Sequence, residues 1–274
     1  MGAVERGIFM TEHQGFEWPN GQRCAVTLTY DDAVPVHHHA VAGLLAANGL
    51  AATFNLDAQS DFTEDPYVWR AVASLGHELG NHTLFHPCRR EPRERFGWLA
   101  PDYDLCEYTP QRWLDEVRVA NCLLRMIDGE SDRTFGNTCC NTSIGRDENE
   151  VDLADLITRL FVAGRGACSN RVVQPTSLHY GALGHFDGDA KTFLDLRGSI
   201  ERAVDVGGWI IFMFHGVGAG THTYFIEEDE HSRLLAYLAE KSAKIWTCSM
   251  VKVATYLKQA GYGLEPNRTD GTDG

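Results

Sequence analysis

Short apolar runs alternate along the chain with longer stretches in which apolar residues recur every three or four positions. The short runs have the length and the β-branched or aromatic content of buried strands, and they lie at 23–30, 51–56, 77–83, 133–138, 161–167, 208–216 and 244–249. The helical patterns between and after them cover 37–48, 66–76, 109–128, 149–160, 190–207, 228–242 and 250–261. Alternating strands and helices predict a parallel sheet, and about seven such units predict an α/β fold of the distorted (β/α)7-barrel type.

Capping residues support several of the predicted helices. Gly49 follows the first one, and Thr109 stands before Pro110 at the start of the longest one. No linker or low-complexity stretch divides the chain, so we expect one catalytic domain over 1–274 with its core at about 23–260. The last residues, 263–274, are polar, and we expect them to be disordered.

The charge balance narrows the choice of partners. There are 24 basic and 38 acidic residues, which gives a formal net charge of −14. An acidic surface repels phosphate backbones, so we expect no nucleic-acid partner and favour a neutral or cationic substrate. The longest strongly apolar run, Trp209–Phe214, is far too short to span a membrane, and we expect no membrane association. A homo-oligomer remains open.

The N-terminal stretch and the cysteines indicate the compartment. The stretch "MGAVERGIFMTEHQGF" lacks the apolar segment of a signal peptide, so we expect a cytoplasmic protein, unless a leader has been removed. Eight cysteines are present, but none forms a C-x-x-C pair. We therefore expect mostly free thiols and no cysteine zinc cluster.

Polar residues gather where the predicted strands end. Asp31 and Asp32 follow the first strand, His82 and His86 follow the third, and His215 follows the sixth. In a β/α barrel the carboxyl ends of the strands form the rim that carries the chemistry. The sequence thus predicts two carboxylates and three imidazoles on one rim.

This set of residues suits a metal site. Histidines four residues apart, such as His82 and His86, can point the same way, and one nearby carboxylate would complete three ligands while leaving positions open for water and substrate. An isolated pair with this spacing is more often ordinary, but the two other strand ends favour a metal. One divalent ion is expected, with zinc the first choice and cobalt, nickel or iron also compatible. The second aspartate could accept a proton from water.

The motifs resemble those of the polysaccharide deacetylase family, which is also called the NodB homology domain or carbohydrate esterase family 4. The family's T-F-D-D motif corresponds to "TYDD" at 29–32, and its H-[ST]-x-x-H motif corresponds to "HTLFH" at 82–86. A hydrophobic strand that ends in histidine corresponds to "IIFMFH" at 210–215. The resemblance covers roughly residues 23 to 260 and implies a barrel with its active site at the carboxyl ends of the strands.

The resemblance also implies a role for each residue. Asp31 corresponds to the general base and His215 to the acid that protonates the leaving group. Asp32, His82 and His86 correspond to the metal ligands. The implied reaction is removal of an acetyl group from an N- or O-acetylated carbohydrate by a metal-dependent hydrolase.

Two motifs of the family depart from their pattern. Where the family often has R-x-P-Y, this chain has "TFGNTCCNT" at 134–142, so Arg165 on the next strand is a candidate replacement and the backbone N–H of Cys139 a candidate oxyanion donor. A thiolate ligand from Cys139 is a weaker alternative. The motif that positions the acid histidine is also unclear, because Asp187 and Asp189 are present but no tryptophan follows them.

Further candidates for contact with substrate or oxyanion are Tyr30 and Trp209, which begins the sixth strand. His179, His185 and His222 are predicted to lie in loops, with no spacing that supports a role. Two rival functions remain open. One is hydrolysis of a C–N bond in a small imide or ureide, which the acidic charge and the altered third motif favour. The other is a sugar-binding or metal-binding homologue without turnover.

Overall fold

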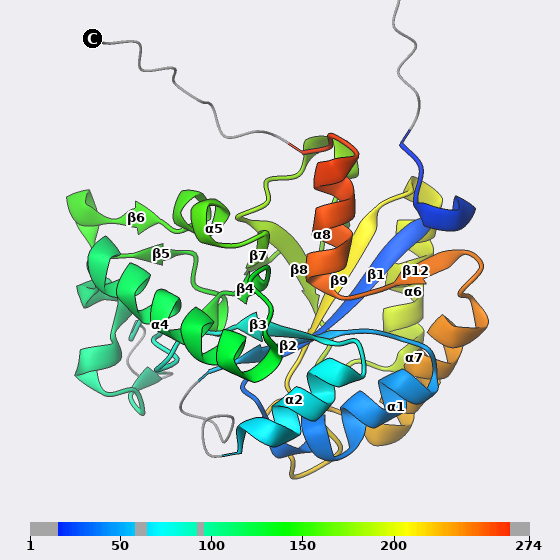
Figure 1. Cartoon of the computed structure of the whole chain (residues 1–274), viewed down its shortest axis with the longest axis horizontal. Helices are drawn as coiled ribbons and strands as arrows, with labels where there is room; N and C mark the ends of the chain where they lie inside the picture. Colours follow the sequence, from blue (N-terminus) through cyan, green and yellow to red (C-terminus); the bar gives the residue numbers. More distant parts are fainter. Residues whose placement is uncertain (1–15, 58–64, 92–95, 264–274) are drawn as a thin grey trace, which may run out of the picture.

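Seven parallel strands form a closed ring in the computed structural model, which describes residues 16–57, 65–91 and 96–263 (Figure 1). In ring order they are β1 (Cys24–Tyr30), β2 (Thr53–Leu56), β3 (Glu78–Asn81), β4 (Thr134–Gly136), β7 (Ala163–Cys168), β8 (Leu183–Asp187) and β9 (Trp209–Phe214). Pairing of β1 with β9, from Ala25 opposite Trp209 to Tyr30 opposite Phe214, closes the ring. The predicted (β/α)7-type barrel is therefore confirmed.

Two strands differ from the prediction: one predicted strand lies outside the ring, and one strand of the ring was not predicted. The run at 244–249 contains β12 (Ile245–Thr247), which pairs with the first residues of β1 and lies outside the ring. Its place is taken by β8, which the sequence reading missed because "LGHFD" lacks a strong apolar pattern. His185, predicted in a loop, lies on β8 and is fully buried.

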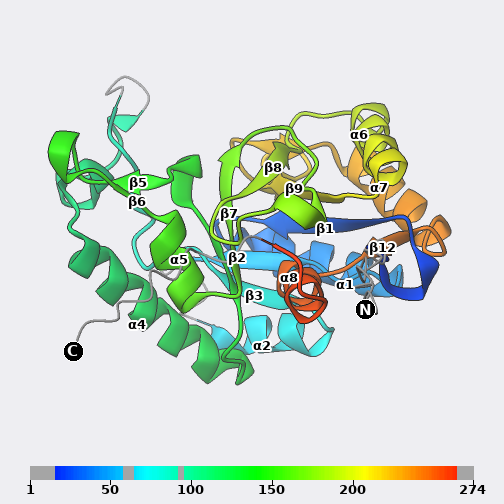
Figure 2. The same cartoon turned by 90° about the horizontal axis from the view of Figure 1, so that it is seen from above.

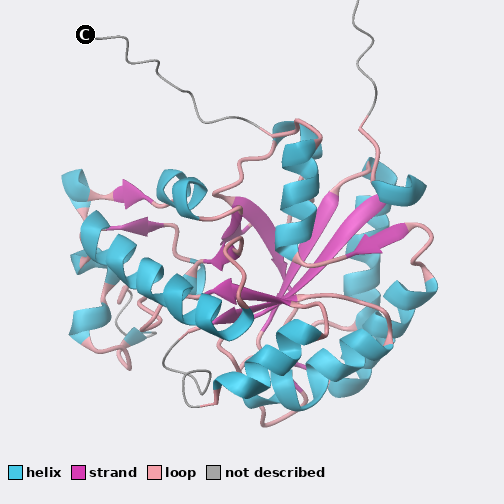
Figure 3. Cartoon of the chain, viewed as in Figure 1, coloured by secondary structure: helices cyan, strands magenta, loops and turns pink. Residues whose placement is uncertain are grey.

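Helices surround the strands, as Figure 3 shows by colour. They are α1 (Ala42–Ala47), α2 (Pro66–Ser74), α4 (Pro110–Asp128), α5 (Ala154–Leu160), α6 (Phe193–Val206), α7 (Glu228–Glu240) and α8 (Met250–Gln259). In the view from above, α2 and α4 lie along one side of the strands, and α6 and α7 lie along the other (Figure 2). As predicted, Thr109 caps α4, because its side chain accepts a hydrogen bond from the Arg112 N–H.

Shorter elements connect these units. A π-helical turn, His37–Val41, precedes α1, and 3-10 turns cover Pro19–Gly21, Pro101–Tyr103, Leu105–Glu107, Thr138–Cys140, Asp147–Asn149 and Pro175–Ser177. Two small strand pairs, β5 (Ser143–Ile144) with β6 (Val151–Asp152) and β10 (Gly216–Val217) with β11 (Phe225–Ile226), lie outside the ring. The helix expected over 149–160 therefore begins only at Ala154, after β6.

The alternation of side chains along β1 decides what reaches the barrel interior. Cys24, Val26, Leu28 and Tyr30 belong to the large cluster that packs between strands and helices. The residues between them face the opposite side, so Asp31 follows on the inner face. The Tyr30 side chain is thus fully buried and points away from the rim. Its hydroxyl lies 2.8 Å from His231 Nε2, so the expected contact between Tyr30 and substrate is wrong.

Trp209 begins a strand, as predicted, but it lies away from the rim. It stands at the start of β9, at the opposite end of that strand from His215, and it is fully buried. Its indole N–H donates to Thr27 Oγ1 at 3.0 Å, and its ring belongs to the cluster that includes Met250 of α8. Trp209 therefore helps to fill the end of the barrel where the strands begin and does not contact substrate at the rim.

Three other expectations concern the cysteines, membrane-spanning helices and the two ends of the chain. Six of the eight cysteines are free, as expected of most of them, but Cys88 and Cys139 form a disulfide. No helix within the described ranges is long and apolar enough to cross a bilayer. The N-terminal stretch 1–15 and most of the polar tail lie outside the described residues.

Candidate functional site

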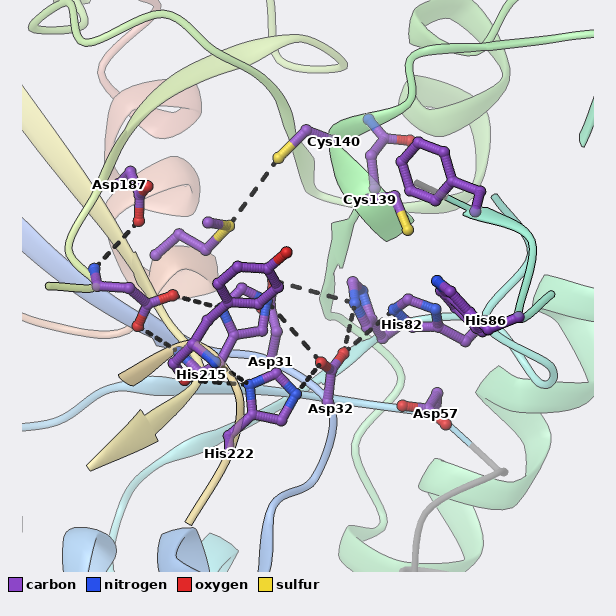
Figure 4. A pocket seen from close by; sticks show the side chains of 16 residues that line it. Asp31, Asp32, Asp57, His82, His86, Cys139, Cys140, Asp187, His215 and His222 are labelled. Atoms are coloured by element: carbon purple, nitrogen blue, oxygen red, sulfur yellow. Dashed lines mark hydrogen bonds and ion pairs between the residues drawn. The ribbon is translucent and has the colours of Figure 1, made fainter. Parts of the chain in front are cut away.

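Three predicted metal ligands converge at the rim of the barrel (Figure 4). Asp32 Oδ1 lies 3.3 Å from His82 Nε2 and 3.2 Å from His86 Nε2. One ligand atom from each of the three side chains lies within 4.8 Å of the others. Two imidazole nitrogens and one carboxylate oxygen facing a common point form a donor set that suits a divalent ion of the zinc type.

A backbone carbonyl fixes the orientation of the His82 ring. His82 Nδ1 lies 2.7 Å from the Gly136 carbonyl oxygen, which can only accept, so Nδ1 carries the proton and Nε2 presents its lone pair toward Asp32. Gly136 has to be a glycine, because a Cβ there would lie 2.7 Å from Asn55 Nδ2 and 3.2 Å from His82 Nδ1. The end of β4 thus holds the first imidazole in the tautomer that a metal needs.

The two histidines are joined by an irregular loop. Thr83 and His86 both have left-handed backbones, with φ of 70° and 47°, and Asp32 has φ of 72°. Such residues cost about 1 kcal/mol or more each and cluster at functional sites. The Thr83 hydroxyl accepts the His86 N–H at 3.1 Å, which closes the loop and leaves the two rings 5.0 Å apart.

Asp31 lies on the inner face of the barrel and is held by two other strands. Arg165 of β7 donates from both terminal nitrogens to the two Asp31 oxygens, and the bond from Nη1 to Oδ1 is 3.0 Å long. Asn55 of β2 donates to Oδ1 at 2.8 Å. The arginine that the third motif lacks is therefore supplied at this position by Arg165.

The charge of Asp31 depends on this pairing. Burial alone would raise the pKa of the carboxyl, but the Arg165 guanidinium, through its charge and its hydrogen bonds, holds it well below its usual range. In turn, Asp31 raises the pKa of Arg165 against the effect of burial. Asp31 is thus an ionised carboxylate whose Oδ2 lies 3.9 Å from His82 Nε2.

His215 follows β9 and makes two hydrogen bonds to Asp189, which lies in the neighbouring loop. Asp189 Oδ2 lies 2.6 Å from His215 Nδ1, and Asp189 Oδ1 accepts the His215 backbone N–H at 3.1 Å. Burial would lower the pKa of the imidazole, but Asp189, Asp31 and Asp32 together raise it to about 9. His215 is therefore an imidazolium at neutral pH, and its Nε2 lies 3.8 Å from Asp32 Oδ2.

A loop residue without any spacing signal completes this side of the site. His222 stacks on His215 with ring centres 5.1 Å apart and places Nε2 3.6 Å from Asp32 Oδ2. The Tyr224 carbonyl oxygen lies 3.0 Å and the Tyr224 backbone nitrogen 3.1 Å from His222 Nδ1, so Nε2 is the ring nitrogen that faces the carboxylate. His179 does not line this cavity, and it lies 3.9 Å from Asp155.

These residues line a cavity of about 400 Å³. Two exposed aromatic side chains, Trp98 and Tyr224, stand on its wall with Phe96. Asp57, at the end of β2, and Asp187 add two further carboxylates to the lining. No lysine or arginine is among the described lining residues, so the cavity is acidic, in agreement with the preference for neutral or cationic substrates expected from the net charge.

Cys139 lines the cavity but cannot act as a thiolate ligand while its sulfur is bonded to Cys88. Its backbone is left-handed, with φ of 49°. The neighbouring Cys140 is a free thiol whose sulfur lies 3.6 Å from His185 Nε2. The segment that replaces the third motif, at 134–142, therefore places a disulfide on the cavity wall beside His86.

Several contributors could not be found by motif. Asn55 lies on β2 and Asp57 directly follows this strand, and their strand-type spacing is the signal that could have identified them. Nothing in the sequence could have identified His222. Asp189, noted but not assigned, is the residue that contacts His215.

Comparisons with known proteins agree with this geometry. The sequence model of the family described as Polysaccharide deacetylase matches residues 19–136, which include the "TYDD" and "HTLFH" motifs. The resemblance that the motifs predicted is thus confirmed over these residues. A search among curated proteins gave no significant match.

Solved structures share the fold at low sequence identity. A substituted form of peptidoglycan deacetylase PdaC from Bacillus subtilis is 13% identical with a TM-score of 0.51, and the match covers 88% of this chain and 94% of that one. A family 4 acetyl xylan esterase from Clostridium thermocellum, in complex with cobalt, is 16% identical with a TM-score of 0.51, at 85% and 91% coverage.

A carbohydrate esterase family 4 pseudoenzyme from Bacillus anthracis gives a weaker match, with 16% identity and a TM-score of 0.48. The match covers 86% of this chain but only 66% of the Bacillus anthracis chain.

Proposed function

We propose that this protein is a metal-dependent hydrolase that removes acetyl groups from N- or O-acetylated carbohydrate. The observation that carries the proposal is the arrangement at the rim. The ligand set Asp32, His82 and His86 lies between an ionised carboxylate, Asp31, and a protonated imidazole, His215. Hydrolysis of an amide or ester needs a base for water, an acid for the leaving group and stabilisation of the oxyanion, and this site offers each of them.

The three ligand side chains fit a divalent ion. His82 Nδ1 is engaged by Gly136, so Nε2 is free to ligate, and Asp32 Oδ1 lies within 3.3 Å of both imidazole Nε2 atoms. An ion bound there would act as a Lewis acid toward the acyl carbonyl and would make a bound water more acidic. We expect zinc first, with cobalt, nickel or iron as alternatives. The acetyl xylan esterase of similar fold was solved with cobalt.

We assign Asp31 as the group that accepts a proton from the attacking water. Its pKa lies well below the usual range, so it is always charged but weakly basic. Such a base works only on water that has been made more acidic, which fits a metal-dependent reaction. Arg165 and Asn55 act as positioning residues, because they fix both the charge and the direction of the carboxylate.

We assign His215 as the acid that protonates the leaving nitrogen or oxygen. Its pKa of about 9 keeps the proton in place at neutral pH, and Asp189 holds Nδ1 so that Nε2 faces Asp32 and the cavity. The backbone N–H of Cys139, on the cavity wall, is the proposed oxyanion donor.

The shape of the rim supports a sugar substrate. Trp98 and Tyr224 are 64% and 53% exposed on the cavity wall, and aromatic faces of this kind pack against the apolar face of a sugar ring. A second hollow of about 510 Å³ shares Asp189 and Tyr224 with the first. Two adjoining hollows leave room for more than one sugar unit, so we expect activity to rise from a monosaccharide to a short oligosaccharide.

A small imide or ureide is the second candidate substrate. A cavity of about 400 Å³ can also hold one small ring, and the acid–base pair would serve C–N cleavage in the same way. Oligosaccharide and imide can be compared directly on one preparation.

The deciding experiment measures acetate release from N- and O-acetylated oligosaccharides and ring opening of a cyclic imide, each with zinc or cobalt. We expect acetate release, and we expect Asp31→Asn to lower kcat by a factor of about 10² to 10⁴. Circular dichroism must show that the variant is folded, since Arg165 loses its counter-charge. His215→Asn, at a less buried position, provides an independent variant. Imide opening without acetate release would refute the proposal.

Metal dependence has its own test. His82→Ala should remove bound metal while the thermal transition shows that the barrel still folds, because the ligand lies on the rim. His179→Ala is the matched control, since that histidine lies outside the cavity lining. Unchanged metal content in His82→Ala, measured by elemental analysis, would contradict the ligand assignment. Acid pH should release the ion, because imidazole ligands must be neutral.

A further inference from the structure

His86 faces two different sets of side chains with its two ring nitrogens. Its Nε2 lies 3.2 Å from Asp32 Oδ1, within the metal site already described. Its Nδ1 lies 3.7 Å from Cys88 Sγ, and Cys88 is bonded to Cys139. One ligand atom from each of His86, Cys88 and Cys139 lies within 4.8 Å of the others. The disulfide therefore occupies a place where two sulfur atoms and one imidazole nitrogen meet.

We propose that reduction of the Cys88–Cys139 disulfide creates a second metal site, made of the two thiolates and His86, that takes a soft divalent ion. This inference goes beyond the proposed function, and its test needs no substrate. Two sulfur ligands and one nitrogen ligand favour zinc or cadmium over hard ions such as magnesium, because thiolate is a soft donor.

The chemistry balances with a dithiol or phosphine reductant. The S–S bond breaks and two thiols form. A dithiol supplies two electrons and two protons and becomes a disulfide, whereas a phosphine supplies two electrons and becomes its oxide, with the oxygen and both protons coming from water. Binding of the ion then displaces one proton from each thiol, and the two protons go to solvent. In a reducing compartment, the prevailing reductants favour the thiol state.

Hydrogen bonds keep the two sulfurs together after the S–S bond breaks. On one side of the disulfide, the Thr138 hydroxyl donates to the Pro87 carbonyl. On the other side, the Arg89 backbone N–H donates to Asn141 Oδ1 at 2.9 Å. The two loops are thus joined at both flanks of the Cys88–Cys139 pair without the help of sulfur.

The backbone at Cys88 is held independently as well. Its N–H donates to the Tyr103 carbonyl at 3.2 Å, and its carbonyl accepts the Leu105 N–H at 3.0 Å. The Cα atoms of Cys88 and Cys139 lie 5.8 Å apart. Two thiolates on one tetrahedral zinc ion have sulfurs about 3.8 Å apart, from Zn–S bonds of roughly 2.3 Å, so small side-chain rotations are enough.

Both sites use His86, so only one of them can hold an ion through His86 at a time. When Nδ1 ligates an ion, Nε2 of the neutral imidazole carries the proton and can no longer bind an ion beside Asp32. Occupation of the thiolate site would then leave the first site with only Asp32 and His82. We therefore expect added cadmium to inhibit the reduced protein and to spare the oxidised one.

The test is a cadmium titration of the full chain, oxidised or reduced with a phosphine and then desalted without oxygen. We expect a thiolate-to-cadmium charge-transfer band in the ultraviolet that saturates at one ion per reduced chain. The band should be absent before reduction. Free-thiol counting should rise from six to eight on reduction, since the structure has six free cysteines and one disulfide.

Variants separate this site from the first one. Cys88→Ser/Cys139→Ser should lose the band or bind cadmium roughly 10-fold or more weakly, although it keeps all six other cysteines. Cys122→Ser, at an exposed free cysteine, should keep the band, and so should His82→Ala, which disrupts only the first site. A band before reduction, an equal band in the double variant, or no band in the reduced protein would overturn the proposal.

Discussion

The rim of the barrel and the opposite end, where the strands begin, each bury a carboxylate, and the pKa of the carboxylate is shifted in opposite directions at the two ends. Where the strands begin, Glu78 of β3 accepts hydrogen bonds from Thr53, from Val251 N–H, and from the backbone and hydroxyl of Thr134, at 2.7 to 2.9 Å. Its pKa is nevertheless raised, because burial outweighs these neutral donors. At the rim, the pKa of Asp31 is lowered, because a guanidinium faces it. Neutral donors orient a buried carboxylate, whereas a full opposite charge also keeps it ionised.

The buried histidines repeat the same contrast. Behind the strands, His231 has the Tyr30 hydroxyl as its described side-chain partner, and burial lowers its pKa to about 4. At the rim, His215 has the Asp189 carboxylate, and its pKa rises to about 9. At the rim, Asp31 and His215 are shifted toward their charged forms, whereas Glu78 and His231 are shifted toward their neutral forms. A site that holds an ionised base beside a protonated acid is suited to acid–base chemistry.

The largest expected effect comes from removing the guanidinium at the rim. Arg165→Met leaves Asp31 buried beside neutral donors, like Glu78, so its pKa should rise. We expect a loss of about 3 to 5 kcal/mol in the free energy of unfolding. We also expect a fall in kcat of more than about 10²-fold. Urea denaturation and steady-state kinetics measure the two quantities.

Arg133→Met is the matched control, because Arg133 is equally buried and pairs with Asp128 away from the cavity. It should lose stability but keep kcat at temperatures where it is folded. If Arg165→Met behaved in the same way, the charge of Asp31 would have no role in turnover.

A smaller effect is expected when the histidine at the rim loses its charged partner. Asp189→Asn should bring the pKa of His215 down from about 9 toward its ordinary value, so the alkaline limb of the kcat profile should move to lower pH. At neutral pH kcat should fall by a factor of roughly 10², with KM little changed. Asp155→Asn is the control, since this exposed carboxylate does not line the cavity. An unmoved alkaline limb would separate Asp189 from the acid step.

The smallest effect concerns the histidine that lacks a charged partner. The folded-state pKa of His231, about 4, lies below the unfolded value of about 6.5, so the unfolded chain binds more protons between these values. Stability should therefore fall as pH drops through this window. His231→Gln should remove about 2 kcal/mol of that fall between pH 7.5 and 5. The measurement is the urea midpoint at several pH values, and a profile identical to that of the unaltered protein would show that His231 is not buried as a neutral ring.

Much of the site was accessible from the sequence because it sits at strand ends. The periodic apolar runs predicted the barrel, and the residues after the first, third and sixth runs supplied the carboxylates and histidines that the structure brings together. The strand at 183–187 was missed because its apolar pattern is weak, and the run at 244–249 was counted in the ring although it pairs only at its edge. Local pattern shows that a strand forms but not which neighbour it pairs with.

What the sequence determined by itself is the chemistry available, namely two adjacent aspartates, a histidine pair and a terminal strand histidine. The tertiary structure alone decided their partners. Arg165 reaches Asp31 across 134 positions of sequence, and Asp189 reaches His215 across 26. Tyr30 and Asp31 are neighbours in the chain, yet the alternation of β1 sends one ring to the helices and one carboxylate to the rim. Charge and proton affinity depend on such distant contacts, and a linear motif carries no record of them.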